Sequence, residues 1–169
     1  MPIAESDIKY YLSGGAGNTD PNASLGGARS TTEVVDNVDN NLFDDVTGDE
    51  SSAGDVEYRC IYVRQEHATL TLQGAKLWID QLTSSPDDEV DIGLDPAGKN
   101  GTATTIADEN TAPSGVTFSR PTTKAAGLSL GDLAPNDFYP FWIRRTVNAG
   151  AAAKNANSYK VRTEGDTAE

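Results

Sequence analysis

Residues 57–80 read EYRCIYVRQEHATLTLQGAKLWID, and this stretch decides the fold. From Val56 to Val63 the side chains alternate in character and are rich in aromatic and β-branched residues, which predicts a strand. The polar run RQEHAT then predicts a turn. In the second strand the alternation slips by one residue at Gly74, where a β-bulge would keep one continuous buried face. The stretch is therefore predicted to be a β-hairpin with a bulged second strand.

The hairpin carries the chain's only cysteine and its only histidine, Cys60 and His67. We expect Cys60 to point into a core between two sheets and His67 to lie at the exposed hairpin end. A cysteine nucleophile needs a base within hydrogen-bond reach, and a zinc site needs more ligands of this kind. No nucleophile elbow, zinc-protease motif or P-loop occurs. The sequence thus predicts a protein that is not an enzyme, with no catalytic, cofactor-binding or metal-ligating residue.

Short alternating segments recur along the rest of the chain, separated by turn-rich runs. They lie at residues 90–94, 116–118, 128–133, 138–143 and 159–163. This rhythm predicts an all-β fold, an antiparallel immunoglobulin-like or fibronectin-like β-sandwich over residues 54–169.

Two local signals qualify this sandwich. LAPNDFY, with Leu133, Pro135 and Tyr139, resembles the tyrosine corner of such sandwiches. Pro140 cannot donate to a ladder, so its strand should start late or lie at an edge there.

Residues 1–53 are rich in Gly, Asn and Asp and are predicted to form an N-terminal arm or an elaborated edge. The run from Ser30 to Tyr58 has many carboxylates and no Lys or Arg, which favours a solvated segment, with a calcium site as the alternative. A short strand is predicted where Ile8, Tyr10 and Leu12 alternate. Together with Tyr11, these are the predicted partner contacts, through addition of a strand to a neighbour.

Charge and length limit the classes of protein. The 169 residues carry a net charge of −13, which disfavours direct contact with nucleic acid because a phosphate backbone needs Lys and Arg. No apolar run approaches the roughly 20 residues that span a bilayer, so no membrane association is expected. The first 15 residues lack the pattern of a signal peptide.

Several stretches resemble small virion structural proteins of tailed bacteriophages. They are NTDPNASLGG (18–27), EYRCIYV (57–63) followed by HATLTLQGAKLWI (67–79), VDIGLDPAGKNGTATTIADENTAPSGVTFS (90–119), and FWIRRTVNAGAAA (141–153) with VRTEGDTA (161–168). The resemblance implies a capsid decoration (cement) protein that binds neighbouring capsomers. It also implies the major capsid protein or another virion protein as partner, a homo-oligomer, and localisation in the virion after assembly in the host cytoplasm.

Two alternatives remain open at this point. The resemblance also fits a tail, neck or baseplate component. A carbohydrate-binding sandwich would need an exposed aromatic platform, for which Trp78, Tyr62, Tyr139 and Trp142 are the candidates.

Overall fold

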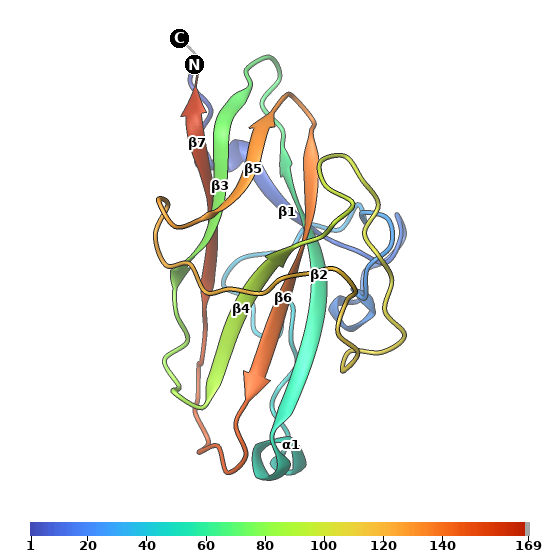
Figure 1. The fold of residues 1–169 in the computed structure, drawn as a ribbon, viewed down its shortest axis with the longest axis vertical. Coiled ribbons are helices and arrows are strands. Elements are labelled where there is room, and N and C mark those ends of the chain that lie inside the picture. The colour runs from blue at the N-terminus through green and yellow to red at the C-terminus, as the bar shows by residue number, and fades with distance from the viewer. Residues whose placement is uncertain (168–169) are drawn as a thin grey trace.

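The computed structural model describes residues 1–167 as two antiparallel sheets with little helix, which confirms the all-β class (Figure 1). The strands are β1 (Ile8–Leu12), β2 (Asp55–Gln65), β3 (Leu72–Gln81), β4 (Asp88–Leu94), β5 (Leu128–Leu133), β6 (Phe138–Val147) and β7 (Lys160–Thr167). Helical turns are limited to α1 (Gly48–Ala53) and the 3-10 segments η1 (Glu5–Asp7) and η2 (Pro21–Ala23). Over this described range, no helix has the length and apolar character to cross a membrane.

The two sheets pack face to face. One has the strand order β1-β2-β6-β4 and the other the order β5-β3-β7. The β-hairpin predicted over residues 57–80 is therefore wrong, because β2 and β3 are strands of different sheets and the turn between them crosses from one sheet to the other. In a constant-type immunoglobulin domain the fifth strand joins the sheet of the first, second and fourth. Here β6 takes that position and β5 lies beside β3, so the immunoglobulin-like order is not confirmed.

The main core lies between the sheets. Its apolar side chains come from strands of both sheets, and β2 and β6 supply the central ones. The buried members are Leu12, Leu42, Phe43, Ile61, Val63, Leu72, Ala75, Leu77, Ile79, Val90, Ile92, Leu130, Leu133, Phe141 and Ile143.

A second core covers the opposite face of β2 and β6. It contains Tyr58, Cys60, Tyr62, Ala103, Ile106 and Trp142. The long connection after β4, yellow in Figure 1, supplies its cover. The Tyr62 hydroxyl donates to the Gly27 carbonyl (2.6 Å) and accepts from the Ala103 N–H (2.9 Å). These bonds attach two loops to the same strand.

The expected position of Cys60 is therefore wrong. The thiol is fully buried, but in the second core and not between the sheets. Alternation tells which residues share a strand face, and β2 is covered on both faces, so the pattern could not tell which face meets the other sheet.

The bulge predicted at Gly74 is confirmed. Gly74 has φ of 56°, and the pairing of β3 with both neighbours shifts register around it. Leu72 before the shift and Ala75 after it are both buried in the main core. The expectation of a strand at residues 116–118 is wrong. These residues form no β-pairing, and only the next residue, Ser119, forms an isolated bridge, to Ile92 of β4.

The expectation for Pro140 holds in part: β6 already begins at Phe138, but Pro140 lies where its ladder with β4 has ended. Pro140 lies in β6, an inner strand, where it pairs with Tyr62. Its carbonyl accepts from the Asp95 N–H just beyond the end of β4, so the missing N–H of Pro140 falls where that ladder has already ended. The strand can thus include proline without losing a bond to β2.

The predicted tyrosine corner takes a different form. The Tyr139 hydroxyl lies near Gly98. The turn before β6 is instead held by the Asp137 carboxylate, which accepts from the Ala134 N–H at 2.9 Å.

Candidate interaction edges

The predicted partner contacts lie on β1, which is an edge strand of the four-stranded sheet. β1 pairs with β2 in the register Ile8↔Gln65 to Leu12↔Ile61. The Tyr10 ring meets Phe141 edge-on, and its hydroxyl donates to Thr163 Oγ1 of β7 at 2.9 Å. Leu12 is 2% exposed. These contacts build the segment into the sandwich of its own chain.

The outer edge of β1 is covered by residues 30–34. The Val34 N–H donates to the Tyr10 carbonyl (2.8 Å), and Leu12 exchanges bonds with this segment at both its N–H and its carbonyl. Strand addition at residues 8–12 would first have to displace this segment. Tyr11 projects from the strand's other face, where its hydroxyl donates to Glu66 (2.6 Å) and the Arg29 guanidinium lies 4.8 Å from its ring.

The β4 edge at the other side of this sheet is also covered. Ile92 and Ser119 exchange two backbone bonds of 2.9 Å each. Arg120 donates to the Val90 carbonyl (3.1 Å) and pairs with Asp91 (3.0 Å). The chain thus occupies this edge with its own residues.

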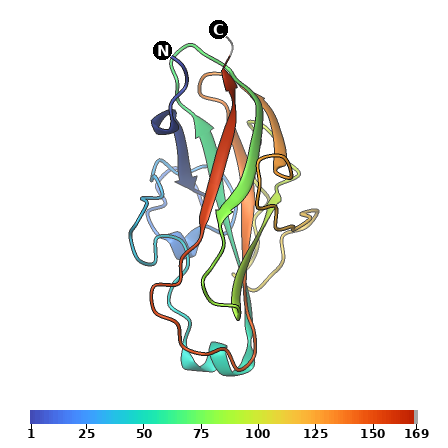
Figure 2. The same cartoon turned by 90° about the vertical axis from the view of Figure 1, so that its left-hand side faces the viewer.

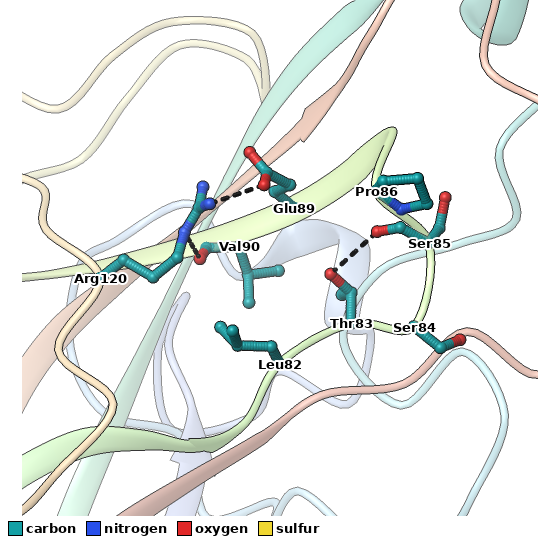
Figure 3. A pocket seen from close by; sticks show the side chains of 8 residues that line it. All are labelled: Leu82, Thr83, Ser84, Ser85, Pro86, Glu89, Val90 and Arg120. Atoms are coloured by element: carbon teal, nitrogen blue, oxygen red, sulfur yellow. Dashed lines mark hydrogen bonds and ion pairs between the residues drawn. The ribbon is translucent and has the colours of Figure 1, made fainter.

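A hollow of about 230 Å³ lies beside the β4 edge (Figure 3). Leu82 and Val90 line its apolar side, and the 83–86 turn closes one end. The only cation that lines it is Arg120, which pairs with Glu89 at 2.8 Å and also with Asp91. Because its charge is already matched, the hollow has no obvious means of holding an anion.

Where β1 has ended, the exposed edge of β2 is closed by two loops. The Cys60 N–H donates to the Ser24 carbonyl and the Tyr58 N–H to the Glu109 carbonyl, both at 2.8 Å. The fully buried Arg59 side chain reinforces this closure through Glu109 (2.5 Å) and Asn22 (3.0 Å). A groove of about 410 Å³ lies between these loops and carries Asp44, Asp108 and Glu109 in its lining.

A buried ion pair, Glu57 with Arg145, lies next to Arg59. The Arg145 Nε donates to Glu57 at 2.6 Å, and the Phe43 ring lies 5.0 Å from the Arg145 guanidinium. Burial raises the pKa of Glu57 to about 7, although Arg145 and Arg59 act to lower it. Arg145 also donates to the Asp44 carbonyl (2.7 Å), so the pair holds the segment that carries Phe43 of the main core, and we assign it a structural role.

β7 differs from these edges. Among residues 1–167, no other backbone segment bonds to its outer side, and its ladder is with β3 alone. β5, at the opposite edge of the sheet, is shorter, is shifted in register, and receives Lys99 at its Asp132 carbonyl (3.0 Å). The sequence analysis missed β7 as a candidate edge. Its alternating charges, Lys160, Arg162, Glu164 and Asp166, were the available signal.

The structure does not bring Cys60 and His67 together. Cys60 lies in the second core, where burial raises the pKa of its thiol well above its usual value. His67 lies half-buried past the end of β2, where its ring accepts from the Thr69 and Leu70 N–H groups and meets the Met1 carbonyl.

Two other proposals from the sequence gain no structural support. No group of three His, Cys, Asp or Glu side chains gathers as a cation site within the part of the chain that the structure describes. Of the four aromatic residues considered for a glycan platform, Tyr62 and Trp142 are fully buried, Trp78 is 5% exposed and Tyr139 is half-buried. These rings therefore serve cores more than a surface.

Comparisons of the chain with protein-family models, with curated proteins and with solved structures give no match.

Proposed function

We propose that this chain is a non-enzymatic structural protein of a tailed-bacteriophage virion. Its role is that of a capsid decoration protein that binds neighbouring capsomers of the head shell. The observation that best supports the proposal is the closure of the sheet edges. The chain covers the β1 and β4 edges and the exposed part of β2 with its own segments, and leaves β7 as a regular outer edge. This pattern suits a rigid module that associates through defined surfaces.

The proposed partner is the major capsid protein. The net charge of −13 would direct the chain to a basic patch on the shell, and attachment would weaken with salt. Many copies on one particle would add avidity to weak single contacts. The role requires a two-sheet sandwich and does not depend on an immunoglobulin-like strand order.

The test is to add the purified chain to head shells that lack it and to measure bound copies by sedimentation. We expect saturable binding that falls as salt rises, with heat-unfolded chain of the same charge as control. Binding to purified tails but not to heads would replace decoration with a tail, neck or baseplate role. Binding to neither would refute the virion proposal, and a specific hit on a glycan array would favour a carbohydrate-binding module.

A further inference from the structure

The backbone of β7 offers a row of hydrogen-bonding groups on its outer side. The Ile79 N–H of β3 donates to the Pro121 carbonyl, away from β7, so Ile79 and its partner Val161 do not exchange bonds. Because bonding alternates along an antiparallel ladder, the N–H and carbonyl groups of Val161, Thr163 and Gly165 point away from the sheet. Figure 2 faces this side of the molecule, and β7 runs along it in front.

The side chains between these positions are charged, in a particular order. Lys160 and Arg162 precede Thr163, and Glu164 and Asp166 follow it at the same spacing. Each of the four is exposed or half-buried. Thr163 is therefore the centre of a sequence in which every cation has an anion at the mirror position.

We propose that two copies of this chain pair edge to edge through β7, antiparallel about a two-fold axis at Thr163. In this register the two Thr163 residues exchange bonds, and each Val161 exchanges bonds with Gly165 of the other copy. Arg162 then faces Glu164 and Lys160 faces Asp166. These fall in the non-hydrogen-bonded pairs, where side chains approach most closely. The two sheets become one continuous sheet, and the inference stands independently of any virion role.

Charges on an edge strand commonly protect it from pairing, so this alternative has to be weighed. Such protection works by repulsion between like charges on the two strands. In the antiparallel register centred on Thr163, each cation faces an anion, so this repulsion is absent. A parallel register would align like charges. A slip of the centre to residue 162 or 164 would place two Arg162 or two Glu164 side chains opposite each other. The charge order of β7 thus disfavours the parallel and the slipped pairings and favours the antiparallel register centred on Thr163.

The charges already take part in weak pairs on the sheet surface, which do not prevent this arrangement. Arg162 lies 3.7 Å from Asp80, and Lys124 lies 3.1 Å from Glu164. The side chains of these two ion pairs, Arg162–Asp80 and Lys124–Glu164, are 32% to 51% exposed. Ion pairs this exposed contribute little to stability. A single shared strand edge buries a small area, and we expect a reversible dimer with a Kd in the micromolar range, on the order of 1–100 μM.

The test is sedimentation velocity over a concentration series at about 0.15 M salt. Wild type should form a reversible dimer. Arg162→Glu should raise the dimer Kd by about tenfold or more, since symmetry makes both Arg162–Glu164 pairs repulsive. Glu164→Arg should do the same, and Arg162→Glu combined with Glu164→Arg should restore dimerisation. Lys154→Glu, an equal charge change in an exposed loop, should leave it unchanged.

Two results of the sedimentation series would overturn the proposal. One is a wild type that stays monomeric to millimolar concentration. The other is a set of variants that dimerise alike. Amide hydrogen exchange on wild type provides a reading that needs no variant. Val161, Thr163 and Gly165 should gain protection as concentration rises, and unchanged exchange at all three would count against the interface.

Discussion

Asp95 is a single buried carboxylate that joins the β4–β5 connection to the sandwich. It is 2% exposed and accepts from the Trp142 indole N–H at 2.8 Å. It also accepts from the Ala97 N–H (2.9 Å) and the Thr104 N–H (3.2 Å). A buried acceptor with three donors is well satisfied, and its loss would leave those donors without partners. The second core thus depends on specific polar side chains as well as on apolar burial.

Cys60 should behave as a structural thiol. In native protein we expect a thiol reagent to label it slowly, because the side chain is fully buried and burial raises its pKa. Unfolding in denaturant should make labelling fast. Cys60→Ala should lower the free energy of unfolding by about 1–2 kcal/mol through a small cavity. Labelling of native protein as fast as of unfolded protein would contradict the placement.

Gly74 should resist replacement for a conformational reason. A Cβ at this position would meet no atom within 4 Å, but the φ of 56° is unfavourable for branched side chains. Gly74→Val should destabilise the fold by about 1–3 kcal/mol, measured by urea unfolding. Gly74→Asn should cost less, since Asn tolerates this backbone region better. Equal stability of the two variants would argue against a strained bulge.

At the level of elements, the N-terminal segment is part of the sandwich. β1 supplies Leu12 and Tyr10 to the core and pairs along its length with β2. Residues 30–34 then bond to its outer side. Two segments of the N-terminal region, β1 and residues 30–34, therefore lie side by side and form this edge of the sheet.

Deletion of residues 1–14 provides a test of this arrangement. It removes β1, exposes the edge of β2 and takes Leu12 out of the core, so the urea midpoint should fall markedly. Loss of buried Leu12 alone is expected to cost about 2–5 kcal/mol. Leu12→Ala, which keeps the strand but shortens this side chain, serves as the matched smaller change. A truncated chain with an unchanged midpoint would show that β1 contributes nothing to the fold.

The alternation of side chains along the sequence predicted where most strands lie. It did not predict which loops cover the faces and edges of those strands. Alternation located strands β2 and β3, and the slip at Gly74 located the bulge, but the predicted hairpin is wrong because β2 pairs with β1 and β6 while β3 pairs with β5 and β7. The second core was not predictable, because Tyr62 and Trp142 meet residues from loops that are distant in sequence. The cover on β1 was missed for the same reason, since Thr32 and Val34 make backbone bonds that side-chain identity does not reveal. Strand assignment to sheets depends on such long-range pairing.

For the whole molecule, buried charge connects stability to pH. The pKa of Glu57 rises in the folded state from its usual 4.5 to about 7. The folded state therefore binds this proton more tightly than the unfolded chain. The stability that this tighter proton binding contributes is fully present below about pH 4.5 and is lost as the pH rises to about 7.

Glu57→Gln should remove this pH dependence. We expect the difference in unfolding free energy between wild type and the variant to change by up to about 1.4 kcal/mol per pH unit in that window. Tryptophan fluorescence in urea measures it, and Glu5→Gln on an exposed side chain is the control. A difference that stays constant across pH 4.5–7 would mean that Glu57 keeps its usual pKa.

The central claim, that this sandwich decorates a phage head, is tested most directly by electron cryomicroscopy of intact particles that contain the chain. The account predicts density for a two-sheet sandwich at regular positions on the outer surface of the head shell, in contact with more than one capsomer. Density confined to the tail, neck or baseplate would contradict it.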